Sequence, residues 1–335
     1  MVTLPAGLAK LDGSVAGLTD RGELIVNQSH SGLGGGILTV LDPTTGATYP
    51  VVNRPPAANQ AAAKSQVGPA TGTADWIVWE EQGFSLETGD WSMWAMERAT
   101  GTIHKIAAFK PGANGLAVPG WPSNVSISGD LAAWSASIEL PGGRIAPRIY
   151  IANLRQGTAR TLEIEGRWPS FISPNQLSAV VLAGTDASGK ALAIPATIAI
   201  ADGTVTKQDW TGPVRVLAYS ASAYGAVVIR LVKQATSDDP VTVAEAITRD
   251  VQGTTRTFAL PNDWGDVAAG KGYLAWSDAQ HLWILPASQV EPRELASVGP
   301  DLGITIQAGG ATLYWGSGGP PVAPTTRSTV TVSCP

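Results

Sequence analysis

Three tryptophans and two charged residues occupy corresponding places in a repeated pattern, and their side chains are well suited to bind a ligand. Seven strands recur along the chain, and a position about ten residues before each of them begins an inner strand of the same repeat. Trp121, Trp168 and Trp264 occupy three of these positions, and Arg167 and Asp263 stand beside two of them. An indole ring with polar neighbours suits stacking on a sugar ring, an aromatic group or a proline-rich segment. The alternative is that each ring packs between adjacent sheets, because large aromatics commonly fill that space in repeat folds.

One histidine and one carboxylate form the best candidate for acid and base catalysis. His30 lies in the glycine-rich segment 29–36, and Glu81 lies in the equivalent region of the next repeat. In a ring of repeats these regions are neighbours, so the pair could transfer protons during a lyase or hydrolase reaction. No nucleophile or second histidine stands beside His30 in a recognisable motif, which also fits a solvated loop histidine. His104 and His281 fall within or next to strands and are expected to pack or to meet solvent.

Other chemistries lack their motifs. The run Gly34–Gly36 is followed by no Lys-Ser/Thr pair and no helix, so it does not resemble a phosphate-binding loop. No Asp-rich stretch has the spacing of a calcium loop. Cys334 is the only cysteine, so neither an intrachain disulfide nor a zinc cluster of cysteines is expected. We therefore predict no metal and no cofactor.

Charge and hydropathy exclude two classes of partner. Lysine and arginine number 22 and aspartate and glutamate 27, which gives a net charge of −5 without any basic block. Binding to nucleic acid is therefore not expected. No apolar run reaches about 18 residues, so no membrane span is predicted.

The composition favours export and an all-β fold. Charged residues make up 15% of the chain, and Gly, Pro and Trp number 38, 24 and 12. Abundant Gly, Thr and Ala with few lysines are typical of exported bacterial proteins. The segment Met1–Pro5 has no signal-peptide pattern. We expect a monomer located outside the cell, in the periplasm or at the cell surface.

Short strands are the elements that must position these side chains. Each recurring strand is preceded by one strand and followed by a third, and a fourth follows in six of the seven repeats. Gly, Asn, Asp or Lys stands at the connecting turns, which is typical of hairpins. The seven recurring strands are 23–26, 75–79, 130–134, 177–181, 226–229, 272–276 and 311–315.

The number and length of the repeats predict a single all-β domain over residues 1–335. Seven units average about 48 residues each, close to the period of propeller repeats. A ring covers each sheet with its neighbours, whereas an open stack would expose two faces. The last repeat is one strand short, and Val2–Leu4 can supply that strand. We predict a seven-bladed β-propeller of four-stranded antiparallel blades closed by the N-terminal strand. Six or eight blades are the alternatives, because the two central repeats lack tryptophan in the recurring strand.

Two turn motifs carry a family resemblance. The first is Ser173-Pro174-Asn175-Gln176, and the second is Asp42-Pro43-Thr44-Thr45-Gly46, which returns as Glu97-Arg98-Ala99-Thr100-Gly101. These repeats resemble the blades of TolB-like and WD-repeat-like bacterial β-propellers. The resemblance implies a channel whose mouth binds a peptide, a protein segment or a carbohydrate. The extra N-terminal α/β domain of TolB has no counterpart here, so the role of TolB is not carried over.

Two functions are therefore compared. The first is a non-enzymatic binding protein that uses Trp121, Trp168, Trp264, Arg167 and Asp263 at the mouth of the channel. The second is a propeller-type lyase or hydrolase that acts on a carbohydrate or small ester through His30 and Glu81. Binding is favoured because propeller enzymes draw several His, Asp, Glu or Arg side chains from different blades, and this chain has three histidines. In either case Trp79, Trp134, Trp276 and Trp315, in the middle of strands, are predicted to be buried.

Overall fold

The computed structural model describes most of the chain as β-strands and turns. It describes residues 13–28, 36–54, 65–83, 90–115, 118, 122–123, 125–234, 242–260, 265–278, 280–297, 304–317 and 326–332. Within these ranges there is no helix, and therefore none long and apolar enough to cross a membrane. The predicted closing strand Val2–Leu4 and Cys334 lie outside the described residues.

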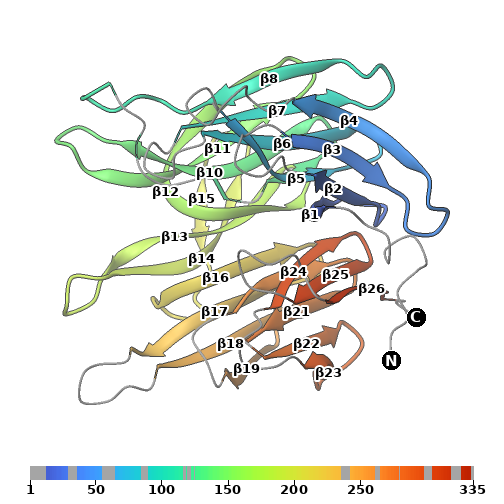
Figure 1. The fold of residues 1–335 in the computed structure, drawn as a ribbon. Coiled ribbons are helices and arrows are strands. Elements are labelled where there is room, and N and C mark those ends of the chain that lie inside the picture. The colour runs from blue at the N-terminus through green and yellow to red at the C-terminus, as the bar shows by residue number, and fades with distance from the viewer. Residues whose placement is uncertain are drawn as a thin grey trace. The chain divides into compact units, whose positions relative to one another are not determined.

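The first of two compact units lies within residues 5–169 and contains two four-stranded antiparallel sheets and strands β9 to β12 of a seven-stranded sheet, β15-β14-β13-β12-β11-β10-β9. Strands that follow one another along the chain pair in order, so each sheet is a meander of hairpins (Figure 1). The strands are β1 Ser14–Leu18, β2 Leu24–Gln28, β3 Gly36–Leu41, β4 Thr48–Arg54, β5 Ser65–Gly72, β6 Trp76–Gly83, β7 Trp91–Glu97, β8 Ile103–Ala108, β9 Ser126–Ser128, β10 Leu131–Glu139, β11 Ile145–Asn153 and β12 Thr158–Ser173.

The second unit starts at Ser170 and repeats the same pattern. Its sheets have the orders β16-β17-β18-β19, β20-β21-β22-β23 and β24-β25-β26, and β13, β14 and β15 follow β12. The strands are β13 Gln176–Thr185, β14 Ala191–Ala199, β15 Val205–Lys207, β16 Arg215–Ser222, β17 Gly225–Lys233, β18 Val243–Asp250, β19 Thr255–Leu260, β20 Val267–Gly270, β21 Tyr273–Ser277, β22 His281–Pro286, β23 Arg293–Ser297, β24 Ile304–Gly309, β25 Thr312–Ser317 and β26 Thr326–Thr331.

The sixteen-residue strand β12 differs from the sequence prediction. The repeat pattern predicts a fourth strand at 160–164 in one repeat and a separate first strand at 171–173 in the next, whereas the structure has one continuous strand over both. Its early residues pair with β11, and β13 is its other neighbour in the sheet. The chain therefore passes from β11 to β13 as one strand, interrupted only by the left-handed main chain at Trp168.

The predicted turn motif closes hairpins through its own side chains. The Asp42 carboxylate accepts hydrogen bonds from the Thr44 amide (2.8 Å) and the Thr45 hydroxyl (2.8 Å). The Gly46 amide donates to the Asp42 carbonyl, with Gly46 at φ 73°. Glycine adopts this left-handed conformation at little cost, so the motif ends strand β3 and starts β4 at a defined register.

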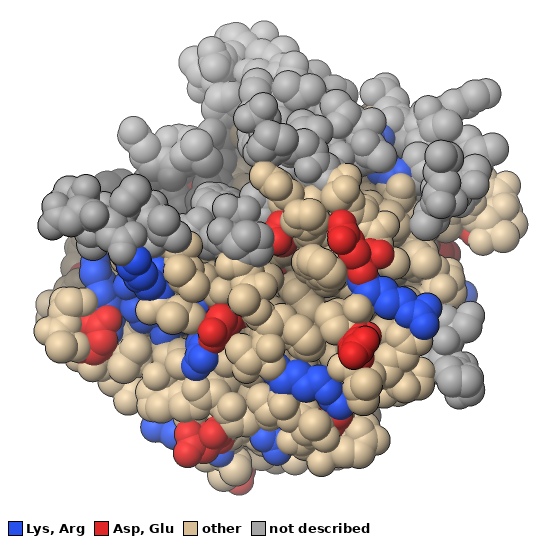
Figure 2. All heavy atoms as spheres, turned by 90° about the horizontal axis from the view of Figure 1, so that it is seen from below, with Lys and Arg blue, Asp and Glu red and all other residues tan. Residues whose placement is uncertain are grey.

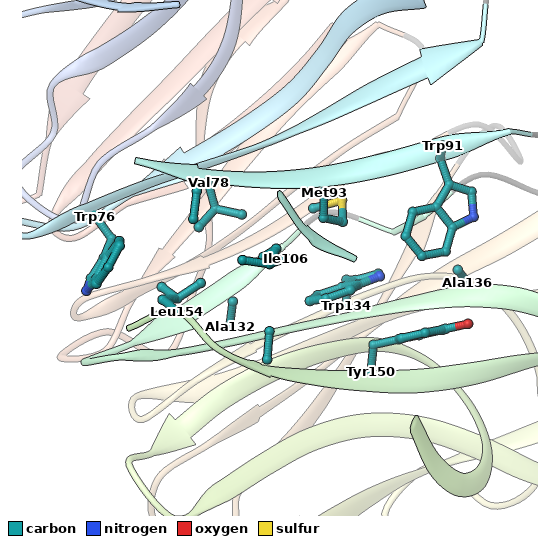
Figure 3. Packing of buried hydrophobic residues seen from close by; sticks show 12 residues of the cluster. Trp76, Val78, Trp91, Met93, Ile106, Ala132, Trp134, Ala136, Tyr150 and Leu154 are labelled. Carbon is teal, nitrogen blue, oxygen red and sulfur yellow. The ribbon is translucent and has the colours of Figure 1, made fainter. Parts of the chain in front are cut away.

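Aromatic rings fill the space between the sheets β5–β8 and β9–β12. Trp134 is fully buried and stacks on Tyr150, with centroids 5.4 Å apart and planes 10° apart. Trp91 meets both rings edge-on, at 6.3 and 5.6 Å (Figure 3). Such pairs add to the free energy gained by burying large apolar surfaces. The predicted burial of the mid-strand tryptophans is confirmed for Trp79, Trp134, Trp276 and Trp315.

Polar contacts join the edges of neighbouring sheets. The Arg98 guanidinium donates to both Glu23 carboxylate oxygens, at 2.7 and 2.9 Å, and lies 5.9 Å from the centroid of Tyr49. The Trp76 indole nitrogen donates to Asp130 at 2.9 Å. In the second unit the Tyr273 hydroxyl donates to the Thr312 carbonyl at 2.7 Å. These directional contacts fix the position of one sheet against the next, which non-directional apolar packing alone would not do.

The charged side chains form no broad patch on the face drawn in Figure 2. Acidic and basic side chains are interspersed among uncharged ones over the described residues of that face. Several of the described basic residues are engaged in ion pairs, for example Arg155 with Asp130 at 3.0 Å. Local pairing of this kind leaves little long-range electrostatic potential.

We expect Trp134→Ala to lower the free energy of unfolding by about 3–5 kcal/mol, because the substitution removes the ring that Tyr150 and Trp91 contact and leaves a cavity. Chemical denaturation of parent and variant measures this difference. Leu182→Ala is the control, because 42% of Leu182 is exposed and its truncation opens no cavity. Similar small losses in both variants would contradict the assignment of Trp134 to the core.

Candidate binding pocket

The structure describes three of the seven predicted site residues. Trp168, Arg167 and Glu81 lie within the described ranges, and all three belong to the first unit. The other four, His30, Trp121, Asp263 and Trp264, lie outside the described residues. Their roles in binding or catalysis remain predictions.

Trp168 and Arg167 line one pocket of about 260 Å³. Trp168 is half-buried and Arg167 is exposed. The remaining walls come from the segment before β9, from β10 and from β11, namely Pro122, Ser123, 135–137 and Pro147. The pocket therefore combines an indole ring, a guanidinium group, two prolines and three serines, which suits a small ligand with both apolar and polar faces.

The main chain at Trp168 is held in a conformation that bulky residues avoid. Its φ is 52°, and it is the only described residue other than glycine with a positive φ. This left-handed conformation costs free energy for a large side chain and persists only when neighbouring contacts hold it. One such contact is the Trp168 amide, which donates to the Ser135 hydroxyl at 3.4 Å. Retained strain of this kind is common at functional sites.

Ser135 and Ser123 hold each other at the floor of the pocket. The Ser135 amide donates to the Ser123 hydroxyl at 2.9 Å, and the Ser123 amide donates to the Ser135 carbonyl at 2.7 Å. Ser135 follows Trp134 in β10, and successive strand residues face opposite sides of a sheet. Burial of the Trp134 ring on one face therefore directs Ser135 to the other face, where it contacts Trp168.

The electrostatics of the pocket are set by Arg167. Among the described residues that line it there is no Asp, Glu or His. Glu165 lies two positions earlier on β12, but both of its carboxylate oxygens accept from the Arg144 guanidinium, at 2.8 and 2.5 Å. Arg148 also approaches Glu165, at 3.6 Å. Glu165 is thus compensated by two other cations, and the positive charge of Arg167 remains available.

Glu81 lies in a separate cluster where it has a structural role. Its Oε1 accepts from Arg54 at 2.9 Å and from the Trp79 indole nitrogen at 3.2 Å. Arg54 in turn lies 5.0 Å from the centroid of Trp94. These contacts join β4 to the sheet β5–β8. The predicted acid/base pair of His30 with Glu81 stays a prediction, because His30 is not described.

Sequence reasoning missed the state of Glu80. Only 2% of this residue is exposed, and its Oε1 has no hydrogen-bond partner. Burial raises the pKa of Glu80 from 4.5 to about 8, against a smaller lowering by the Gln82 side chain. The carboxyl is therefore mostly protonated at neutral pH. The one sequence signal was a glutamate directly after a strand of buried type, Trp76–Trp79.

The two described histidines outside the pocket have local partners. His104 Nε2 lies 2.6 Å from the Leu154 carbonyl, and His281 Nδ1 lies 3.0 Å from a Glu294 oxygen. The hydrogen bond to Glu294 raises the pKa of His281. In the described part of the chain, no three His, Cys, Asp or Glu side chains are placed to hold a metal ion.

The solved structures that resemble this chain include a β-propeller domain. The β-propeller domain of the trilobed protease from Pyrococcus furiosus is 9% identical, with a TM-score of 0.51 over 88% of this chain and 85% of that domain. Polysaccharide lyase Uly1 is 8% identical, with a TM-score of 0.51 over 92% of this chain and 86% of Uly1. These likenesses confirm the predicted β-propeller fold. No protein-family model matches the chain, and no curated protein matches it in sequence.

Several similar structures are longer than this chain. TolB from Acinetobacter baumannii is 15% identical, with a TM-score of 0.45 over 81% of this chain and 64% of TolB. An acylaminoacyl peptidase from Pyrococcus horikoshii is 11% identical, with a TM-score of 0.44 over 59% of this chain. The chain spans 35% of the length of that peptidase.

We expect Glu80→Gln to stabilise the protein in a pH-dependent way. In the parent, the folded state holds a proton that the unfolded state releases above its ordinary pKa, so stability falls as pH rises from 4.5 to about 8. Glutamine removes this loss, so the variant should gain melting temperature over the parent as pH rises, with little difference near pH 4. Glu291→Gln, at an exposed position, should show no such trend. A difference that is constant with pH would contradict the buried, protonated state.

Proposed function

We propose that this protein is a non-enzymatic binding β-propeller and that the Trp168 pocket is its ligand site. The observation that carries the proposal is the strained main chain at Trp168, which places a half-buried indole beside an exposed arginine and three serines. This strain has no evident benefit to the core, since the ring is not among the buried residues. A preformed aromatic platform with nearby hydrogen-bonding groups is the usual form of a small-ligand site.

The ligand is a carbohydrate or a peptide segment. The indole face can stack on a sugar ring or on proline, and Pro122 and Pro147 provide rigid apolar walls. The serine side chains and the guanidinium supply directional hydrogen bonds to hydroxyl, carbonyl or carboxylate groups. Sugars present both kinds of surface at once, which favours a carbohydrate.

An enzymatic function is the second candidate, because Glu80 offers a carboxyl that is protonated at neutral pH. A general acid with a raised pKa is what a hydrolase or lyase acting on a carbohydrate or small ester needs. Polysaccharide lyase Uly1 has the same fold, but fold alone carries no activity. Glu81 is engaged by Arg54, and the described lining of the Trp168 pocket contains no acid or base. Binding therefore remains the favoured function.

We also propose that the sheets form a closed ring of seven blades. If β12 is counted in two sheets, the described strands make seven sheets, the last with three strands. In the proposed ring Val2–Leu4 pair with β26 as the missing strand, and the Trp168 pocket opens at the mouth of the channel. The protein is proposed to be an exported monomer that binds no nucleic acid and has no membrane span.

Deletion of residues 1–9 tests the ring closure. Loss of the closing strand exposes a sheet edge and weakens one interface between blades, so the melting temperature should fall by several degrees. The trilobed protease propeller has an open velcro topology, so a propeller that its N-terminal strand does not close has a precedent. A melting temperature within about a degree of the parent would mean that the N-terminal strand does not close the ring.

Trp168→Gly tests the binding site. Glycine adopts a φ of 52° without strain, so the segment keeps its conformation while the ring is lost. Loss of the stacking anchor should weaken binding by roughly 1–3 kcal/mol, with little loss of stability. Glycans and proline-rich peptides selected on arrays with the parent serve as ligands for calorimetry. Unchanged affinity would remove Trp168 from the site, and a large loss of stability would assign the ring to packing.

A further inference from the structure

We propose that the Trp168 pocket recognises an acidic sugar, with the Arg167 guanidinium binding the sugar carboxylate and the Trp168 ring stacking on the sugar ring. This inference rests on the proposed binding function and names the ligand class of the same site. It concerns residues of a single compact unit, which all lie within residues 5–169.

The conformation of Trp168 explains how two neighbouring residues can serve one ligand. In a regular strand, adjacent side chains point to opposite faces of the sheet. Arg167 and Trp168 nevertheless line the same pocket. The left-handed φ of 52° at Trp168 interrupts the alternation at this point. The pocket thus presents a cation and an aromatic ring together, which a sugar with a carboxylate requires.

The Arg167 guanidinium is available to bind an anionic ligand. It is exposed, and none of the ion pairs found among the described residues includes it. The closest acidic residue on its strand face, Glu165, is paired with Arg144. Arginine binds a carboxylate through two parallel N–H donors, a geometry that lysine does not reproduce.

The remaining polar groups fit hydroxyls rather than a second charge. Ser123 and Ser135 use their hydroxyls to hold the main chain of the pocket. Ser137 also lines the pocket, and among the described residues its hydroxyl has no protein partner. It can therefore donate to or accept from a sugar hydroxyl.

The charge count selects the kind of anion. Arg167 is the only cation among the described residues that line the pocket. One guanidinium matches one carboxylate, whereas a phosphate group, with up to two charges, is usually held by several cations or main-chain amides. A uronate sugar supplies one carboxylate on a ring with an apolar face, which is the combination that Arg167 and Trp168 can accept.

A glycan array tests the ligand class. The full chain is applied to an array that displays uronate oligosaccharides, their methyl-esterified forms, neutral oligosaccharides of the same linkage and proline-rich peptides. We expect retention on uronate spots and loss of at least about tenfold in signal on the esterified forms, because the ester removes a charge-assisted hydrogen bond. Retention on neutral or esterified sugars alone would overturn the acidic-sugar inference and leave the binding function standing. Retention on peptides alone would overturn the sugar class, and no retention on any spot would overturn the binding function as well.

Variants of Arg167 test the contact itself. With the retained uronate oligosaccharide, Arg167→Gln should weaken binding about tenfold or more, and Arg167→Lys should recover only part of the loss. The affinity of the parent should fall with added NaCl, and that of Arg167→Gln should depend less on salt. Arg160→Gln, at an exposed position on the same strand and outside the pocket, is the matched control. Equal affinities and salt dependence for the parent and Arg167→Gln would overturn the assignment of Arg167.

Discussion

Burial of aromatic rings between successive sheets is the interaction on which the rest of the structure depends. A four-stranded meander has two faces, and neither can be left in water if both are apolar. In the first unit Trp134, Tyr150 and Trp91 fill the space between two such sheets, and Trp276 stacks on Phe258 in the second, at 5.0 Å. The strands, turns and polar contacts position the aromatic rings of each sheet against the neighbouring sheet.

The pocket is a consequence of that packing. Trp134 must point into the core, so the next residue, Ser135, emerges on the other face of β10. There it accepts the Trp168 amide and helps to hold the left-handed main chain. Ser135 therefore links the burial of Trp134 to the half-buried position of Trp168. This link explains how a repeat scaffold with uniform strands can carry a local, irregular site.

Polar groups inside the first unit divide into satisfied and unsatisfied ones. Glu81 Oε1 accepts hydrogen bonds from Arg54 and Trp79, whereas Glu80 on the opposite face of β6 has an oxygen without a partner. The Trp134 indole nitrogen and the Tyr150 hydroxyl are also buried without partners. Figure 3 shows these two polar ends turned the same way along the sheet. A neutral Glu80 lowers the cost of burying its own side chain, because a buried carboxylate would cost far more than a buried carboxylic acid.

The sequence by itself determined the class of fold and the positions of its strands. Alternation of apolar residues and the Asp42–Gly46 type of turn are local signals, so the predicted recurring strands overlap β2, β6, β10, β13, β17, β21 and β25. The burial of Trp134 and Trp276 followed from their places in the repeat. Only the tertiary structure decided that β12 is one continuous strand within a seven-stranded sheet and that Trp168 adopts a positive φ. It also decided that Glu81 pairs with Arg54 while Glu80 Oε1 has no partner. These features depend on contacts between residues far apart in the chain, and a period of two along a strand carries no information about which distant group will meet a side chain.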